Sequence, residues 1–442
     1  MKTPICDFVQ KYAISDSLKL HMPGHKGKSF LGMECLDITE IDGADSLYEA
    51  NGIIAESEKN ASELFGCNTF YSTEGSSQCI RAMLYLISAR ERIRCKQPLV
   101  WAGRNAHKAF HSAVGLLDID VEWIYPDNAE NYLSCNISAE SLTNLLNDCT
   151  QKPSAIYLTS PDYLGNVLDI EAIAVVCHKN DILLAVDNAH GAYLKFLKSS
   201  LHPIDLGADI CCDSAHKTLP VLTGGAYLHL SDELMHEVGS QVKNALVLFG
   251  STSPSYLILQ SLDAANGYLE NHRERLGEFV YKVEKLKEQL SYLGYELYGN
   301  EAIKITIQAK KFGYRGHALA KILNQKGIVC EFCDSDFVVF MLTPEVENLD
   351  FIVEVMQSIP KLSDVNEDMP TFKVAKKKMS IREALLSPFE TLPVEECLGR
   401  VVAMTTVGCP PAVPIVVAGE IIDENTLDCF IYYGINKINV VK

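Results

Sequence analysis

The feature that most constrains the fold is an alternation of short apolar runs with helix-length segments between about residues 60 and 230. The runs read LVWAG (99–103), AIYLTS (155–160), ILLAVD (182–187), ADICC (208–212) and GGAYLHL (224–230). Strands with so few polar positions are buried on both faces, which indicates a mostly parallel sheet covered by helices on either side. We therefore expect an α/β fold whose ligands bind at the carboxyl ends of the strands.

Four chemically useful side chains come shortly after these runs or end them. Lys217 follows ADICC, and Asp187 ends ILLAVD. His107 follows LVWAG, and Tyr163 follows AIYLTS. Since the carboxyl ends of parallel strands meet at one edge of a sheet, we expect all four on a single rim.

Lys217 lies in the stretch DSAHKT (213–218), with a histidine directly before it and hydroxyl groups on either side. A lysine amine can form a Schiff base with pyridoxal phosphate, whose ring accepts electrons when a carboxylate keeps its nitrogen protonated. Asp187 can provide that carboxylate. The phosphate needs backbone N–H groups at a helix start, and TEGSS (73–77) offers a glycine and two serines before a helical segment. Together these features predict a pyridoxal phosphate site.

Each feature also has a simpler interpretation. Asp187 can form a plain turn at a strand end. TEGSS can cap a helix, and His107 can be a capping histidine instead of a ring stacked on the cofactor. Taken singly, these simpler interpretations are favoured, whereas the order of the features along successive strand ends favours the cofactor site.

Two spacings approach those of metal sites without completing one. His107 and His111 stand at i and i+4, but HKAFH lacks the glutamate of the H-E-x-x-H zinc motif. CEFC (330–333) is a lone C-x-x-C inside a strand-like segment, with no second pair of ligands. We therefore expect no metal, and we interpret Cys330 and Cys333 as packing residues.

The composition argues against nucleic-acid-binding, secreted and membrane proteins. The 442 residues are 48% hydrophobic, which allows a large core, and the net charge of −18 argues against a partner rich in phosphates such as nucleic acid. The 15 cysteines follow no secreted spacing, and no apolar segment has the length of a signal peptide or a membrane span. We expect a cytoplasmic protein whose partners are small molecules or other protein chains.

The amino-acid composition also changes along the chain. A charged helical segment begins near residue 266, and a polar stretch over 362–380 is typical of a linker. These changes predict four parts, which are an N-terminal arm (1–30), a large cofactor-binding domain (31–265), a small α/β domain (266–361) and a C-terminal domain (362–442).

Several motifs make the sequence similar to a known family. They are HMPGHKG (21–27), DITEIDGADSL (37–47), RNAHKA (104–109), VDNAHGAY (186–193), SAHKTLPVLTGGAYLH (214–229), STSPSYLILQSLD (251–263) and, more weakly, GCPPAVPIVVAGE (408–420). In these stretches the chain resembles the bacterial ornithine/lysine/arginine decarboxylases, pyridoxal phosphate enzymes of fold type I (the aspartate aminotransferase superfamily). The resemblance implies a mostly parallel sheet in a large domain, with smaller α/β lobes toward the C-terminus.

The resemblance also assigns roles to individual residues. Lys217 would carry the Schiff base, Asp187 would pair with the ring nitrogen, and His107 would stack on the ring. Either Lys217 or His216 would return a proton to the substrate Cα. The other expected cofactor contacts are Gly75, Ser76, Ser77, Ala189, His190, Ser214 and His216, with Ser251 and Thr252 reaching the phosphate of a neighbouring subunit.

The implied activity is decarboxylation of a basic amino acid. Compact members of the group resemble biosynthetic arginine decarboxylases, so we favour L-arginine, giving agmatine for polyamine biosynthesis, with lysine or ornithine as alternatives. Glu331 and Glu420 are the candidate carboxylates for the cationic end of the substrate. Rival interpretations are an aminotransferase or lyase on the same scaffold, and a protein that binds the cofactor without turnover.

The sequence departs from the family pattern in two loops. Where the family more often has Pro-Pro-Gly-Ile-Pro, this chain has PPAVP (410–414), and since alanine takes φ > 0 only at a cost, we expect a differently shaped loop. TEGSS lacks the Asn-Gly often seen in the phosphate loop. The resemblance is to the short form of the family, without an N-terminal response-regulator-like domain, so we expect a homodimer or a dimer of dimers with shared active sites.

Overall fold

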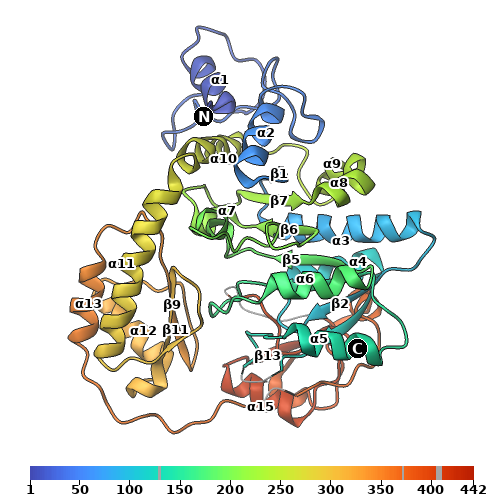
Figure 1. Ribbon diagram of the computed structural model, residues 1–442, viewed down its shortest axis with the longest axis vertical. Coiled ribbons are helices and arrows are strands. Elements are labelled where there is room, and N and C mark those ends of the chain that lie inside the picture. The colour runs from blue at the N-terminus through green and yellow to red at the C-terminus, as the bar shows by residue number, and fades with distance from the viewer. Residues whose placement is uncertain (128–130, 371–372, 405–410) are drawn as a thin grey trace. The chain divides into compact units, whose positions relative to one another are not determined.

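The computed structural model describes residues 1–442 except 128–130, 371–372 and 405–410 (Figure 1). Gly408, Cys409 and Pro410 of the motif GCPPAVPIVVAGE therefore lie outside the described residues. The chain separates into two compact units. The first comprises Met1–Pro98, Ser154–Tyr157 and Ile170–Arg275, and the second comprises Leu99–Pro153, Leu158–Asp169 and Leu276–Lys442.

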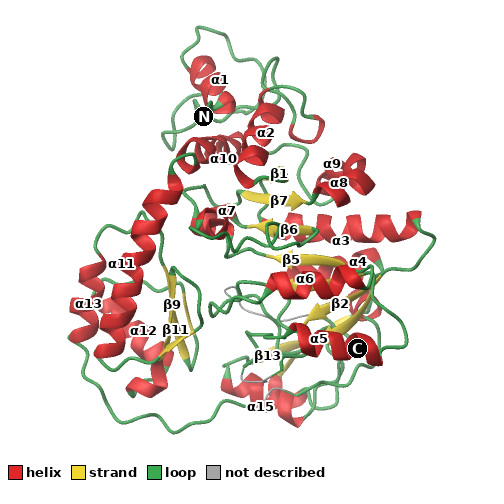
Figure 2. Ribbon diagram, viewed as in Figure 1, coloured by secondary structure: helices red, strands yellow, loops and turns green. Residues whose placement is uncertain are grey.

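Seven strands form the central sheet, in the order β1-β7-β6-β5-β4-β2-β3 (Figure 2). They are β1 Asn68–Ser72, β2 Leu99–Gly103, β3 Asp120–Ile124, β4 Ala155–Thr159, β5 Leu183–Asp187, β6 Ile210–Asp213 and β7 Ala226–Leu230. β5 pairs with β6 in parallel, and β2 pairs with β3 in parallel. The expected α/β fold with a mostly parallel sheet is confirmed.

β7 is the exception to the parallel pattern, because it pairs antiparallel with both β1 and β6. The segment between β6 and β7 contains only the four-residue helix α7, Ala215–Thr218. A parallel return needs a longer crossover, usually a full helix. The chain therefore turns back after Lys217 and re-enters the sheet in the opposite direction.

The burial of the strands follows from their sequences. Every residue of β2, β5, β6 and β7 is buried, as expected for apolar runs covered on both faces. β3 stands at the sheet edge, and its exposed Asp120 and Glu122 place charges there. Charged side chains on an edge strand oppose pairing with a foreign strand.

The first unit carries most of the helices that surround this sheet. α3 packs against β6 and β7, and α2 packs against β1. The helices of this unit are α1 Pro4–Ala13, α2 Ile53–Phe65, α3 Ser76–Ile93, α6 Ile170–Lys179, α7 Ala215–Thr218, α8 Asp232–Val238, α9 Val242–Val247 and α10 Tyr256–Leu269, with 3-10 helices η1 Leu47–Glu49, η2 Ala192–Phe196 and η3 Gly239–Gln241.

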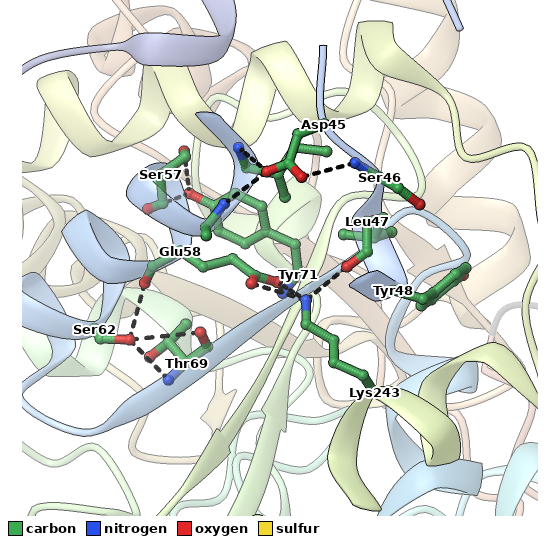
Figure 3. Close-up of polar contacts among 12 residues, drawn as sticks. Asp45, Ser46, Leu47, Tyr48, Ser57, Glu58, Ser62, Thr69, Tyr71 and Lys243 are labelled. Atoms are coloured by element: carbon green, nitrogen blue, oxygen red, sulfur yellow. Dashed lines mark hydrogen bonds and ion pairs between the residues drawn. The ribbon is translucent and has the colours of Figure 1, made fainter. Parts of the chain in front are cut away.

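A partly buried ion pair fixes β1 to the neighbouring helices (Figure 3). Lys243 Nζ of α9 lies 2.6 Å from Glu58 Oε1 of α2, and the N–H of Tyr71 in β1 donates to the same oxygen at 2.9 Å. Burial raises the pKa of Glu58, and Lys243 opposes that shift. Asp45 accepts the N–H of Ile54 at 3.0 Å and so fixes the first turn of α2. These contacts anchor the strand that leads into the loop before α3.

The second unit contains two further small sheets. One has the order β10-β11-β9-β8, with antiparallel neighbours, and the other pairs β12 with β13. Their strands are β8 Leu297–Tyr298, β9 Lys304–Gln308, β10 Phe332–Cys333, β11 Phe337–Met341, β12 Phe389–Pro393 and β13 Lys437–Val441. A cluster including Val402, Ile422, Phe430 and Val440 forms the C-terminal core.

The helices of the second unit are α4 Lys108–Leu117, α5 Ala139–Asp148, α12 Gly316–Gln325, α13 Leu349–Gln357, α14 Ile381–Leu386 and α15 Glu424–Tyr432, with 3-10 helices η4 Ala309–Phe312 and η5 Val394–Glu396. The long charged helix α11, His272–Tyr292, begins at the end of the first unit and continues into the second. Over the described residues, no helix combines the length and the apolar character that crossing a membrane requires.

Candidate active site

Lys217 lies on the short helix α7, directly after the buried strand β6. The chain leaves β6 at Asp213 and turns through Ser214, which places Lys217 partly exposed just beyond the carboxyl end of the strand. Lys217 Nζ lies 2.9 Å from Nε2 of His190, which follows the adjacent strand β5. An amine must lose its proton before it can attack a carbonyl, and the imidazole is placed to take that proton.

Asp187 ends β5 and is only 2% exposed. Its Oδ2 accepts the Tyr157 hydroxyl at 3.1 Å, while Oδ1 accepts the Ala189 N–H at 3.2 Å and the Cys212 thiol at 3.7 Å. Burial raises the pKa of Asp187, and the charge of Lys217 and the hydrogen bonds oppose that shift. A second cation beside this carboxylate would be strongly favoured, which fits a protonated ring nitrogen.

The start of α3 has the properties of an anion site. Gly75, directly before the helix, has φ +72°, and a Cβ there would meet no other atom within 4 Å. The helix begins with Ser76 and Ser77, runs for 18 residues, and has no side-chain cap. Ser76 Oγ accepts the Ser214 hydroxyl at 2.7 Å, which joins the helix start to the lysine segment.

An unsatisfied hydroxyl lies in the same loop. Thr73 Oγ1 is buried and has no hydrogen-bond partner among the residues that the structure describes. Buried polar atoms are nearly always hydrogen-bonded, so this position calls for an acceptor or donor from a ligand or water. The uncapped helix start, the open space at Gly75 and this hydroxyl together fit a phosphate group.

A buried carboxylate beside the lysine segment has no counterpart among the predicted residues. Asp213 ends β6, and its Oδ1 accepts Asn188 Nδ2 at 2.6 Å. Its Oδ2 lies 3.1 Å from His202 Nε2 and 3.2 Å from His229 Nε2. Although burial acts in the opposite direction, the two histidines hold the pKa of Asp213 well below its usual range. One carboxylate therefore ties the end of β6 to the residue after Asp187 and to β7.

This network also explains a cluster of potential metal ligands. His202, Cys211 and Asp213 place ligand atoms within 4.8 Å of one another. Since the oxygens of Asp213 are already hydrogen-bonded, we interpret the cluster as structural.

Among the other predicted cofactor contacts, His216 is held against a backbone carbonyl, whereas Ser251 and Thr252 are exposed. His216 Nδ1 lies 3.0 Å from the carbonyl oxygen of Gly225, so its ring is held against the loop before β7. Ser251 and Thr252 are exposed in the single chain, and Ser251 Oγ accepts the N–H of Ser253 at 3.1 Å. Their contact with a neighbouring subunit stays a prediction.

His107 and His111 lie in the second unit. His107 is the N-cap of α4, and its Nδ1 accepts the N–H of Ala109 at 3.1 Å. His111 is buried with Nε2 3.2 Å from the carbonyl oxygen of Ala106, and burial lowers its pKa to about 3. The capping role of His107 is thus present, and its stacking on the cofactor stays a prediction.

The two candidate substrate carboxylates differ in their exposure to solvent and in their partners. Glu420 is 3% exposed, and its Oε2 lies 3.0 Å from Arg104 Nη2 and accepts the N–H of Val417 at 2.9 Å. Glu331 is exposed and accepts the Tyr163 hydroxyl at 2.8 Å. Because the charge of Glu420 is already compensated within the chain, Glu331 is the better placed of the two to meet a cation.

The structure bears on two sequence interpretations of the second unit. Cys330 and Cys333, interpreted as packing residues, are only partly buried, because β10 is a two-residue strand at the sheet edge. Ala412 has φ +57°, so it takes the left-handed conformation that is costly for alanine, and the different loop shape stays a prediction. The carbonyl oxygen of Ala412 accepts the N–H of Lys108 at 2.9 Å, which helps to hold that conformation.

Comparison with known proteins gives two family matches. Residues 3–309 match the family model described as Orn/Lys/Arg decarboxylase, major domain, and residues 363–436 match its C-terminal domain. The arginine decarboxylase of Bacillus subtilis is 28% identical over 463 residues, covering 96% of this chain and 92% of that protein. The arginine decarboxylase of Halalkalibacterium halodurans is 27% identical, with coverages of 96% and 92%.

Solved structures share the fold. The lysine decarboxylase of Francisella novicida gives a TM-score of 0.81 at 16% identity, covering 100% of this chain and 81% of that one. Lysine decarboxylase A of Pseudomonas aeruginosa gives a TM-score of 0.80 at 16% identity, covering 99% and 80%.

Proposed function

The chain belongs to the Orn/Lys/Arg decarboxylase family, whose members depend on pyridoxal phosphate, and we propose that its substrate is L-arginine and its products are agmatine and CO₂. The choice of arginine is supported by the arginine decarboxylases that are similar along nearly the whole chain. Agmatine production would serve polyamine biosynthesis.

One observation carries the proposal. Within the first unit, the Ser214–Ser76 hydrogen bond joins the start of α3 to the lysine segment, and the charge of Lys217 acts on Asp187. An anion site, an amine and a buried carboxylate are thereby linked in one place. These are the three groups that a pyridoxal phosphate enzyme needs.

The residues present fit the cofactor. Gly75, Ser76 and Ser77 would hold the phosphate with Ser214, and Asp187 would hold a proton at the ring nitrogen. The cofactor supplies an aldehyde that binds amino groups and a ring that accepts the electron pair released at Cα. The further contacts assigned to Ala189, His190, His107 and His216 belong to the same proposal.

Lys217 and His190 are the groups placed to move protons. With Nζ and Nε2 at 2.9 Å, His190 can accept the ammonium proton and return it. His216 has its Nδ1 against the Gly225 carbonyl, so we assign the proton delivered to the substrate Cα to Lys217. The Asp213 network keeps the lysine segment in position while these protons move.

The substrate test compares three amino acids. Purified protein with pyridoxal phosphate is incubated with arginine, lysine or ornithine, and both CO₂ and the amine product are quantified. We expect agmatine and equimolar CO₂ from arginine, with a lower kcat/KM for the other two. Preference for lysine or ornithine would overturn the substrate assignment, and accumulation of pyridoxamine phosphate without CO₂ would overturn decarboxylation itself in favour of an aminotransferase.

We propose a homodimer, or a dimer of dimers, with shared active sites, in which the exposed Ser251 and Thr252 reach the phosphate of the partner subunit. If these hydroxyls serve the partner's phosphate, a Lys217→Ala subunit and a Ser251→Ala/Thr252→Ala subunit carry their defects in different halves of each site. Mixing the two inactive proteins under exchange conditions should then restore activity in one site per hybrid dimer. Absence of recovery in verified hybrid dimers would contradict the shared site.

A further inference from the structure

Tyr163 follows the end of β4, and the proposed function gives it no role. The residue is 8% exposed, and its hydroxyl donates to Glu331 Oε1 at 2.8 Å. The Tyr163 ring packs against that of Phe332, with centroids 5.2 Å apart. A buried phenol therefore holds one oxygen of the carboxylate of an exposed glutamate.

The backbone on both sides of Tyr163 is fixed to β9. Lys304 Nζ donates to the carbonyl oxygen of Asp162 at 3.2 Å. Thr306 Oγ1 donates to the carbonyl oxygen of Leu164 at 2.8 Å. The buried Asp162 side chain also accepts the N–H of Leu164 at 2.9 Å through Oδ1. Because both neighbours of Tyr163 are held in this way, its hydroxyl occupies a defined position.

Glu331 directly precedes the short strand β10. Its N–H donates to the carbonyl oxygen of Val339 in β11 at 2.9 Å, which fixes the backbone from which the side chain extends. Among the residues that the structure describes, the Tyr163 hydroxyl is the partner of the Glu331 carboxylate. The terminal torsion of a glutamate is broad, so the carboxylate plane of an exposed glutamate rotates easily unless a hydrogen bond holds it. The phenol supplies that restraint.

A fixed carboxylate plane affects two kinds of cation differently. A guanidinium is planar and binds a carboxylate through two parallel N–H groups, so the two planes must coincide. An ammonium is a compact charge with three rotatable donors and tolerates many orientations of the carboxylate. A carboxylate has about four acceptor positions, so the bond from the phenol leaves both oxygens able to accept a guanidinium N–H.

We propose that Tyr163 is a positioning residue that sets the preference for a guanidinium over an ammonium side chain, by fixing the plane of the Glu331 carboxylate. This inference rests on the proposed contact between Glu331 and the cationic end of the substrate. The charge of Glu331 attracts either cation, whereas the orientation of its carboxylate favours L-arginine over lysine and ornithine. Attraction and selectivity are therefore assigned to two different residues.

The test measures KM and kcat of the holoenzyme for arginine and for lysine in the parent protein and in Tyr163→Phe, which keeps the ring and removes only the hydroxyl. We expect KM for arginine to rise about tenfold, the lower end for a hydrogen bond that involves a charged group. KM for lysine and both kcat values should change by less than about twofold, because an ammonium does not depend on the carboxylate plane. A loss of folding would instead lower kcat for both substrates.

Two further variants separate this inference from the proposed function. Glu331→Gln removes the charge, so KM should rise about tenfold or more for both substrates. Tyr132→Phe is the matched control and should keep the parent's KM values, because Tyr132 packs against the same cluster as Tyr163 and no hydrogen bond joins it to Glu331 in the described structure.

The outcomes distinguish the two claims. If Glu331→Gln raises KM while Tyr163→Phe changes KM equally for arginine and lysine, or not at all, the role of Tyr163 is overturned and that of Glu331 stands. If Glu331→Gln leaves KM unchanged, the substrate contact in the proposed function is wrong, and the inference built on it fails as well.

Discussion

Lys217 Nζ lies 2.9 Å from His190 Nε2, and the two residues follow the ends of the adjacent parallel strands β6 and β5. The amine is therefore presented beside a group that can hold its proton. Both residues are positioned by the sheet and by the turns that follow it.

Lys217→Ala should remove both turnover and the covalent attachment of the cofactor. Lys217 Nζ is the amine that the structure places beside His190, so the variant lacks the group proposed to attach the cofactor. Borohydride reduction followed by peptide mapping should label Lys217 in the parent protein and give no label in the variant. Lys195→Met, which removes an amine paired with Asp205 instead, should keep both the visible absorbance and the label.

Asp187→Ala should keep the phosphate contacts and reduce kcat by a factor of about 10³ or more, since an unprotonated ring is a poor electron acceptor. Cofactor retention is checked by absorbance after gel filtration, and kcat by agmatine formation. Tyr157→Phe removes only one hydrogen bond to Asp187 and should cost about tenfold at most. An Asp187→Ala protein as active as the parent would contradict the role of this carboxylate.

Glu331→Gln should weaken substrate binding, whereas Glu420→Gln should lower the stability of the folded protein. Glu331→Gln keeps the Tyr163 contact but loses the charge, so KM for arginine should rise by about tenfold or more while stability is unchanged. Glu420→Gln leaves Arg104 as an unpaired buried charge and should lower the free energy of unfolding by about 3 kcal/mol. Urea unfolding and steady-state kinetics on both variants distinguish the roles, and the reverse pattern would refute them.

Acid should destabilise the protein in part through His111. Its pKa is about 3 in the folded chain, against 6.5 for the unperturbed group. Between these values the unfolded chain binds a proton that the folded chain excludes, so stability falls as pH decreases from 6.5 toward 3. The limiting slope is about 1.4 kcal/mol per pH unit for one group. His111→Gln should reduce the slope measured by urea unfolding, and a slope equal to that of the exposed-site control His236→Gln would contradict this assignment.

Ala412→Gly should stabilise the loop of the C-terminal part. Ala412 has φ +57°, where a Cβ costs about 1–2 kcal/mol, and a glycine removes this cost. The greater conformational freedom of glycine in the unfolded chain opposes part of the resulting stabilisation. We expect a net gain of about 0.5–1 kcal/mol in urea unfolding. Ala418→Gly, at a buried position outside the left-handed region, is the matched control and should lose stability.

The sequence predicted five of the seven strands of the central sheet and a mostly parallel direction, because apolar runs separated by helices leave few alternatives to a covered parallel sheet. It did not predict the edge strands β1 and β3, which contain polar residues. It did not predict the reversal of β7, since an apolar run carries no information about strand direction. The short segment after Lys217, with only four helical residues, is the signal that would have revealed it.

For the site, local motifs indicated Lys217, Asp187 and the start of α3, because each stands beside a strand or helix end. Asp213 and Tyr157 had no such signal. Asp213 is bonded to His202 and His229, which meet it only after the chain has folded. Tyr157 lies inside an apolar run, where a tyrosine is indistinguishable from core packing until its hydroxyl is seen on Asp187.

The three-way anchorage of Asp213 has a consequence for how such a chain can diverge. The amine proposed to perform the chemistry follows a buried junction held by several hydrogen bonds, whereas Glu331, the proposed partner of the substrate cation, directly precedes a short edge strand in the second unit. If both proposals hold, exchanges near Glu331 would change the choice of amino acid and leave the reactive groups unaltered.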